Sequence, residues 1–295
     1  MASGELTDST MIRRVLPKVW AFDLEWVPDA AAGRTLLVLP PDLGEREVFE
    51  AMWAAAGATG ENPQPYLKPL MCRVASAAMV ERVEREAGPA TVRLCSLPKA
   101  GDLDEAQLVA TFLTALGEHR PQLVGFNSVA ADLRVLVQRG MLLGVRAPGF
   151  CEQPQRPWEG PNYFYPNSEW NVDLMRLTGG GGRSAPALRE LAALAGIPAK
   201  TNGSGDAVAE MWLRGEHDRI VSYNECDAVT TYLVWLRSAH FAGCFTTDEY
   251  LAEQGLAEDL LEREGASKEH LADYLDRWRE GRRQRGDLRA LAAAG

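Results

Sequence analysis

The first strong pattern in the chain is an alternation of side chains in residues 18–28, KVWAFDLEWVP. Successive side chains of an extended backbone point to opposite sides, so Asp23 and Glu25 share one face with two small apolar residues. The opposite face holds Trp20, Phe22 and Leu24. The alternation therefore predicts a strand that buries one face and carries two acids near its end.

The remaining pattern predicts further strands and helices in alternation. Strands are predicted at residues 72–82, 91–97, 122–127 and 171–175. Helices are predicted at residues 45–56, 102–117 with Asp102 or Asp104 as N-cap, 130–140, 184–196 with Ser184 as N-cap, 207–215 and 217–237. This order of elements predicts an α/β layer structure, in which a mixed sheet carries helices on its faces.

Three longer segments lie between or after these elements. Residues 29–65 are rich in Ala, Gly and Pro and are interpreted as a surface excursion around one short helix. Residues 147–170 are crowded with Pro and aromatic side chains, which indicates an ordered loop. Residues 241–295 are rich in Ala, Glu and Arg, so we predict a C-terminal helical extension after a domain of residues 1–240.

Composition and charge narrow the class of protein. A chain of 295 residues with 46% hydrophobic and 24% charged residues is an ordinary globular sequence with a sizeable core. The formal net charge of −10 argues against binding nucleic acid by bulk electrostatics, because phosphates need clustered Lys and Arg. An acidic pocket that binds divalent cations remains compatible with this charge.

Targeting and cysteine signals are weak. The chain has no run of about eighteen apolar residues, and its N-terminal sequence lacks the basic start and apolar stretch of a signal peptide. We therefore expect a cytoplasmic protein that does not bind a membrane. The five cysteines are scattered without a CxxC pair, which indicates neither a disulfide framework nor a zinc site.

Several acids stand where carboxylates can carry chemistry, although each is ordinary by itself. Asp23 and Glu25 have Cα atoms roughly 6.5–7 Å apart on a strand, so both side chains can reach one cation. Tyr223 and Asp227 lie one turn apart on the same face of a predicted helix. Asp132 lies in the first turn of another helix, where the helix dipole favours an acid. Taken singly, such residues are more often solvated than functional.

Taken together, these residues form three motifs in a recognisable order. The motifs are FDLEW (22–26), GFNSVAAD (125–132) and YNECD (223–227). Their order and their positions on a first strand, a strand-to-helix junction and a late helix resemble the DEDD superfamily of 3'-to-5' exonucleases. Three independent matches are far more specific than any one of them.

The third motif also indicates a subclass. Ser222 stands where the His-type branch of the superfamily has histidine, so the chain resembles the Tyr-type branch. Residues 172–177, 188–200 and 223–237 are similar to bacterial stand-alone exonucleases related to the proofreading domain of family-B DNA polymerases. The resemblance covers roughly residues 17–240. It departs from the family at Ala131, where an aromatic residue often precedes the second-motif Asp.

The resemblance implies a ribonuclease H-like fold and a two-metal-ion phosphodiester hydrolase. It implies that Asp23, Glu25 and Asp227 hold one Mg²⁺ or Mn²⁺. Asp23 would also bridge to a second ion that Asp132 supports through water, and oxygen-only ligands suit these hard cations. Tyr223, whose phenol is neutral near pH 7, would orient the attacking water. The implied substrate is the 3' end of DNA, single-stranded, and the implied product is a 5'-mononucleotide.

Three residues near the motifs are candidates for substrate binding, and each has a plainer alternative. Trp26, like the aromatic residues 163–165, stacks on single-stranded bases or packs in the core. Asn127 contacts the terminal nucleotide or closes the strand-to-helix turn. Lys200, with the Gly203–Gly205 loop, binds a phosphate or lies in a solvated turn.

Two other functions fit the same sequence. An RNA exonuclease of the ribonuclease D type uses the same four acids, and the choice between RNA and DNA rests on contacts to the 2'-OH. A non-catalytic nucleic-acid-binding or scaffold module would keep the fold and dock partners through residues 241–295. Such a module has no physical need to crowd carboxylates together, which argues against it. The sequence predicts no particular oligomeric state.

Overall fold

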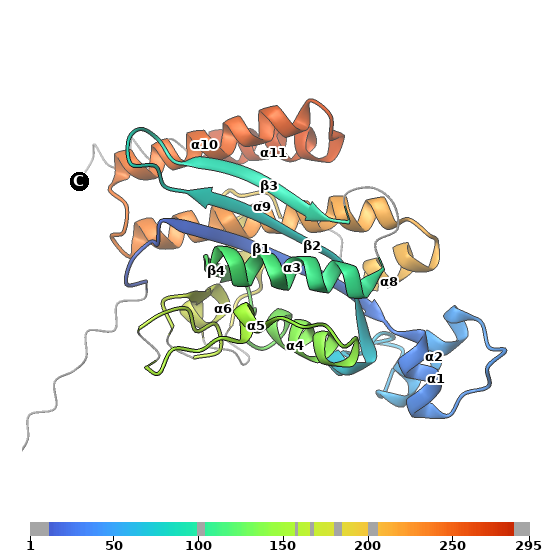
Figure 1. The fold of residues 1–295 in the computed structure, drawn as a ribbon. Coiled ribbons are helices and arrows are strands. Elements are labelled where there is room, and N and C mark those ends of the chain that lie inside the picture. Colours follow the sequence, from blue (N-terminus) through green and yellow to red (C-terminus); the bar gives the residue numbers. More distant parts are fainter. Residues whose placement is uncertain are drawn as a thin grey trace, which may run out of the picture.

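The computed structural model describes residues 12–98, 104–156, 159–165, 168–179, 185–199 and 206–285, apart from the side chains of residues 206 and 285. Its centre is a five-stranded sheet in the order β3-β2-β1-β4-β5 (Figure 1). The strands are β1 (Lys18–Pro28), β2 (Cys72–Val83), β3 (Thr91–Leu97), β4 (Gln122–Gly125) and β5 (Asn171–Asp173). Strands β1, β2 and β3 are antiparallel neighbours, whereas β4 and β5 run parallel to β1. This mixed sheet confirms the predicted α/β class.

Helices cover both faces of the sheet. The α-helices of the described residues are α1 (Ala30–Leu37), α2 (Glu45–Ala55), α3 (Glu105–His119), α4 (Asp132–Leu142), α5 (Pro148–Cys151), α6 (Leu174–Thr178), α7 (Leu188–Leu194), α8 (Asp206–Leu213), α9 (His217–Phe241), α10 (Thr247–Gly265) and α11 (Glu269–Arg285). Helices α1 and α2 pack on each other beyond the end of the sheet (Figure 1). Helix α9 crosses β1 and β2 on one face, and α3 and α4 pack on the other (Figure 1). None of the described helices is both long and apolar enough to cross a membrane.

The two faces of β1 bury different clusters. Val19 and Ala21 pack in the cluster that contains the apolar residues of α9. The face toward α3 and α4 carries Trp20, Phe22 and Leu24. The predicted alternation is confirmed, and the same period of two directs Asp23 and Glu25 to the α9 face.

Helix α1 is not predicted by the sequence pattern, because its small residues make the segment look like a loop. Gly33 lies where α1 crosses α2, and a Cβ at this position would stand 2.5 Å from the sulfur of Met52. The side chain of Asp29 caps the helix by accepting a hydrogen bond from the N–H of Ala31 at 3.0 Å. The small residues therefore allow the two helices to approach closely. The sequence around α1 alone does not predict this packing.

Several predicted boundaries are wrong by a few residues, among them those of the fifth strand and of α7. The strand predicted at 171–175 ends at Asp173, because this side chain accepts the N–H of Met175 at 3.1 Å and begins α6. The helix predicted to follow Ser184 begins at Leu188. Ser184 itself lies outside the described residues.

A buried ion-pair cluster fixes α4 against the sheet. The Arg139 guanidinium lies 2.5 Å from the Glu105 carboxylate and 2.9 Å from the Asp29 carboxylate. Glu105 also accepts the N–H of Val74 of β2 at 2.8 Å. Buried charges are costly to leave unpaired, so these contacts resist any shift of α4 relative to β2. Asp132, the first residue of α4, is thereby held in place.

Helices α10 and α11 extend the core on the α9 side of the sheet. Their buried apolar residues share one cluster with α9 and β1, and they include Tyr250, Leu260, Leu261, Leu271, Tyr274, Leu275 and Trp278. Arg82 of β2 pairs with Glu253 of α10 at 2.6 Å, and both side chains are less than a tenth exposed. The domain boundary at residue 240 stays a prediction, and it falls within α9.

Candidate active site

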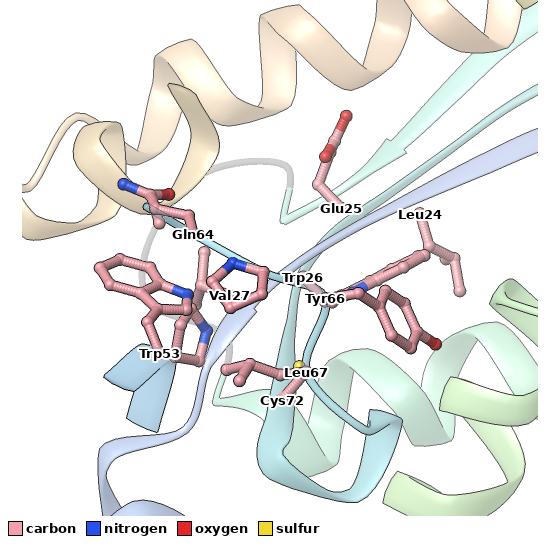
Figure 2. A pocket seen from close by; sticks show the side chains of 12 residues that line it. Leu24, Glu25, Trp26, Val27, Trp53, Gln64, Tyr66, Leu67 and Cys72 are labelled. Atoms are coloured by element: carbon pink, nitrogen blue, oxygen red, sulfur yellow. The ribbon is translucent and has the colours of Figure 1, made fainter. Parts of the chain in front are cut away.

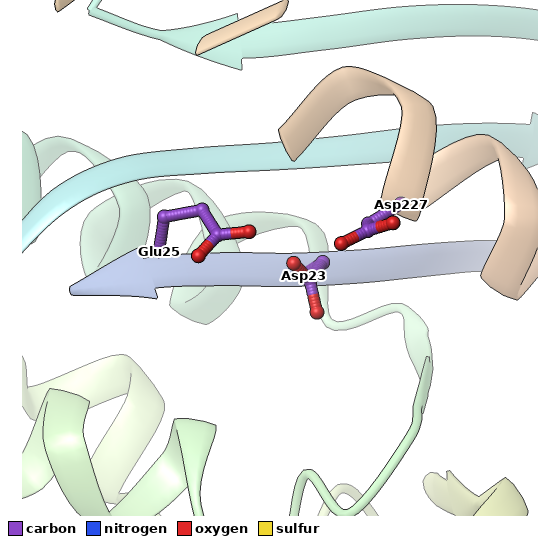
Figure 3. Close-up of side chains that lie close together, drawn as sticks. All are labelled: Asp23, Glu25 and Asp227. Carbon is purple, nitrogen blue, oxygen red and sulfur yellow. The ribbon is translucent and has the colours of Figure 1, made fainter. Parts of the chain in front are cut away.

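Three carboxylates meet between strand β1 and helix α9 (Figure 3). Asp23 and Glu25 lie on the face of β1 that α9 crosses, and Asp227 lies on α9. Each residue offers one carboxylate oxygen, and these three atoms lie within 4.8 Å of one another. All three residues are half-buried. Acids from distant parts of the sequence thus form one compact set of oxygen atoms that can bind a cation.

The pairing of β1 with β2 shifts by one residue directly after Glu25. Glu25 pairs with Ser76 and Trp26 pairs with Val74, which makes Ala75 of β2 the extra residue of a β-bulge. A bulge bends its strand and re-aims the neighbouring side chains. The sheet therefore bends at the point where β1 carries its second acid.

Asp132, the fourth predicted acid, lies beside β1 but outside the group of three. It is buried at the start of α4, and its carboxylate accepts hydrogen bonds from its own backbone and from that of Leu24. Burial raises the pKa of Asp132 to about 7, with a contribution from the nearby Asp173 carboxylate and against the effect of the backbone hydrogen bonds. Leu24 lies between Asp23 and Glu25 in the strand. The hydrogen bond from its backbone therefore places the Asp132 carboxylate close to both acids along β1.

The loop before α4 is held by a residue that the motifs did not single out. The carboxylate of Asp173 accepts the N–H of Asn127 at 2.9 Å and that of Val129 at 3.1 Å. An Asp at a strand-to-helix junction is the only sequence signal for this role. Asp173 thus sets the geometry of the turn that leads to Asp132.

Asn127 closes this turn through its backbone. It adopts a left-handed conformation with φ of 62°, and its carbonyl accepts the N–H groups of Ala130 and Ala131. A Cβ at Gly125 would lie 2.5 Å from the Cβ of Ser128, so the close approach requires glycine. The turn-closing interpretation of Asn127 accounts for these contacts, and its contact with a nucleotide stays a prediction.

Tyr223 lies one turn before Asp227 on α9 and borders the acid group. The residue is partly buried against Val27 and Ile220. Burial raises the pKa of its phenol above the usual value, and the carboxylates of Glu25 and Asp227 raise it further. A phenol that stays neutral beside carboxylates can donate one hydrogen bond to an acid or a water molecule. This protonation state is the one that the predicted water-orienting role requires.

A pocket of about 310 Å³ opens along β1 next to Glu25 (Figure 2), and we call it the Glu25 pocket. Trp26 lines it together with Trp53, Gln64 and Tyr66, which come from α2 and the segment after it. The Glu25 carboxylate points away from these side chains (Figure 2). The pocket therefore borders the acid group from the side and has a volume at the lower end of ligand sites.

The aromatic residues of this pocket separate into buried and accessible ones. Trp26 is half-buried and packs against two apolar clusters while it also lines the pocket, so its two interpretations are compatible. Tyr66 is 67% exposed, and its phenol lies within electrostatic reach of Arg134 and Asp132. Sequence reasoning missed Tyr66 because it directly follows the excursion of residues 29–65, far from every motif.

Of the other predicted contact residues, the structure describes the aromatic residues 163–165. Lys200 and the Gly203–Gly205 loop lie outside the described residues. Tyr163 is buried, and its hydroxyl donates a hydrogen bond to the carbonyl of Pro121 at 3.0 Å, as core packing requires. Tyr165 is 40% exposed.

Comparison with known proteins adds three findings. Residues 64–278 match the model of a family described as predicted 3'-5' exonucleases related to the exonuclease domain of PolB. Among solved structures, the chain is similar to the family B DNA polymerase from the hyperthermophilic archaeon Pyrobaculum calidifontis, with 18% identity and a TM-score of 0.41. That similarity covers 85% of this chain and 29% of the polymerase chain. No curated protein sequence matches the chain.

Proposed function

Because the chain belongs to the family of predicted 3'-5' exonucleases related to the exonuclease domain of PolB, we propose that it degrades DNA from the 3' end. The reaction is a divalent-metal-dependent hydrolysis that releases 5'-mononucleotides. The observation that carries this proposal is the convergence of Asp23, Glu25 and Asp227, whose ligand atoms lie within 4.8 Å of one another. Like charges at such distances repel one another, and a bound cation would offset that repulsion.

The donor set suits Mg²⁺ or Mn²⁺, because every candidate ligand atom is a carboxylate oxygen. Asp23, Glu25 and Asp227 would hold one ion, and Asp132 would support a second ion through water. When bound, the two cations supply activation of the attacking water and charge neutralisation at the leaving 3'-oxygen.

The protein's own groups orient the substrate and the water. The Glu25 pocket would take the terminal nucleotide, with the rings of Trp26 and Tyr66 against its base and sugar. The Tyr223 hydroxyl would hold the attacking water by a hydrogen bond, since its raised pKa keeps the proton on the oxygen.

Tyr223→Phe is expected to slow nucleotide release by about tenfold to a hundredfold without abolishing it. One hydrogen bond to a charged group is worth about 1.5–3 kcal/mol, and its loss leaves the carboxylates in place. Steady-state release of mononucleotides from a single-stranded oligonucleotide in Mn²⁺ measures the effect. Tyr165→Phe, the same change at an exposed tyrosine, should match the wild type. A Tyr223→Phe variant as slow as a variant without one of the acids would contradict the water-orienting role.

The proposed function is tested by digestion of one oligonucleotide labelled at either end. In Mn²⁺ the 5'-labelled strand should shorten in single-nucleotide steps, and the 3'-labelled strand should release labelled mononucleotide at once. Chelation of the metal should stop both. A matched RNA strand distinguishes a DNA exonuclease from an RNA exonuclease, because only RNA carries the 2'-OH. Internal fragments, or unchanged strands in Mn²⁺, would refute the proposal.

A further inference from the structure

We propose that a second pocket, on helix α4, holds an unpaired base of the DNA strand whose 3' end is cleaved. Arg134, at the rim of this pocket, binds a phosphate of the same strand. The inference rests on the proposed function and specifies its substrate as single-stranded at more than the terminal nucleotide. The pocket has a volume of about 280 Å³, and we call it the α4 pocket. Its lining includes Val129, Leu133, Arg134, Val137, Gln138 and Phe164.

The α4 pocket adjoins the proposed site along the chain and in space. Leu133 and Arg134 directly follow Asp132 at the start of α4. Arg134 also lies within electrostatic reach of Tyr66, which lines the Glu25 pocket. Arg134 therefore stands between the two pockets. A strand with its last nucleotide beside Glu25 would meet this guanidinium before it reached the α4 pocket.

The charge of Arg134 suits a phosphate. The residue is exposed and forms no ion pair with any residue that the structure describes. Several exposed arginines among the described residues are paired with acids, as Arg46 is with Glu210 and Arg219 with Glu216. The chain has a net charge of −10, which does not attract a phosphate. An unpaired guanidinium beside the acidic site supplies this attraction locally.

The interior of the α4 pocket suits a base. Phe164 offers a partly buried ring, and Leu133 and Val137 add apolar side chains. Stacking on an aromatic ring accepts any base, because every base has a π-face.

These contacts select single strands over duplexes. A base within a duplex has its faces covered by neighbouring bases and its Watson–Crick edge occupied by its partner. Only an unpaired base can present a free face to the ring of Phe164. The pair of pockets therefore fits a frayed or single-stranded 3' end.

The test compares two substrates that differ in length. A single-stranded oligonucleotide spans both pockets, whereas the 4-nitrophenyl ester of thymidine 5'-monophosphate has one base and reaches only the Glu25 pocket. For Arg134→Ala and Phe164→Ala, the loss of kcat/KM on the oligonucleotide should exceed the loss on the ester by about tenfold. Most of this loss should appear in KM.

Salt dependence provides a second measurement that a change in folding would not mimic. Loss of one phosphate contact to a single strand should lower the slope of log KM against log salt concentration by about 0.7 in Arg134→Ala. Arg134→Lys keeps the charge and should keep the slope. Arg146→Ala removes an exposed arginine beyond the other end of α4 and should match the wild type in both measurements.

The outcomes separate this inference from the function on which it rests. If the wild-type chain cleaves neither substrate in Mn²⁺, the proposed function fails and the α4 pocket fails with it. If the wild type cleaves both, but Arg134→Ala loses equally on both or keeps its salt slope, only the role of the α4 pocket is overturned. A larger loss on the oligonucleotide, a lower slope and recovery in Arg134→Lys support it.

Discussion

Asp227→Ala is expected to release nucleotides at least about a thousandfold more slowly than the wild-type chain. A cation held by Asp23, Glu25 and Asp227 would lose one of three protein ligands, and its charge on the reacting phosphate is worth several kcal/mol. The fold should survive, because removing one acid from a group of like charges relieves repulsion. Release of mononucleotide from single-stranded DNA in Mn²⁺ measures the activity, and thermal unfolding without metal checks the fold.

Asp218→Ala is the matched control, since Asp218 is an exposed acid on the same helix, outside the acid group. It should keep the wild-type rate. Calorimetric titration with Mn²⁺ should show binding to the wild type and to Asp218→Ala, and much weaker binding to Asp227→Ala. Full activity in Asp227→Ala would remove the metal assignment, and with it the mechanism proposed for this site.

The parts of the site that local periodicity controls could be predicted from the sequence. The period of two in β1 predicted that Asp23 and Glu25 share a face, and the packing of Val19 and Ala21 against α9 confirms that face. The spacing of Tyr223 and Asp227 likewise follows from one turn of helix. Both predictions need only the repeat of a single element.

The parts that depend on contacts between elements could not be predicted. Helix α1 shows no helical pattern of apolar residues, because Gly33 is required for its close packing on α2. Tyr66 borders the site because the segment between α2 and β2 lies beside β1, and no nearby residue in the sequence predicts this contact. The buried position of Asp132 depends on a turn that Asp173 ties down from another strand. These contacts join residues that are far apart in the sequence. A pattern within one short segment therefore cannot predict them.

The position of Asp227 also depends on an anchor on the far side of α9. Glu225 is buried two residues before Asp227 and accepts hydrogen bonds from Ser96 at 2.6 Å, His270 at 2.7 Å and Lys268 at 2.8 Å. Burial alone would raise the pKa of Glu225, but these partners lower it to about 2. A lowered pKa means that the carboxylate stabilises the fold fully above its ordinary value near 4.5 and loses that effect as the pH falls toward 2.

The anchor joins the proposed catalytic helix to the C-terminal extension, because Lys268 and His270 belong to the junction of α10 and α11. Strand β3 contributes Ser96 to the same carboxylate. Helix α9 is therefore held between the acid group on one side and the extension on the other. The extension acts on the site as a support for the helix that carries Asp227.

A chain that ends at Ala242 is accordingly expected not to fold into a stable structure. Truncation there removes α10 and α11, whose buried leucine, tyrosine and tryptophan side chains each contribute about 1.5–3 kcal/mol. Their sum is as large as the roughly 5–15 kcal/mol that stabilises a whole domain. The cut also leaves Arg82 without Glu253, and Glu225 without Lys268 and His270. Soluble yield, circular dichroism and thermal unfolding of the truncated chain measure the result.

Two substitutions in the full chain separate packing from length. Trp278→Ala should lower the free energy of unfolding by about 3–5 kcal/mol, because its ring is buried against the α9 cluster. Phe241→Ala removes an aromatic ring that is 78% exposed and should leave stability close to that of the wild type. A truncated chain that unfolds cooperatively and still shortens DNA would instead show that residues 1–242 form an independent domain. The extension would then have a role other than the support of α9.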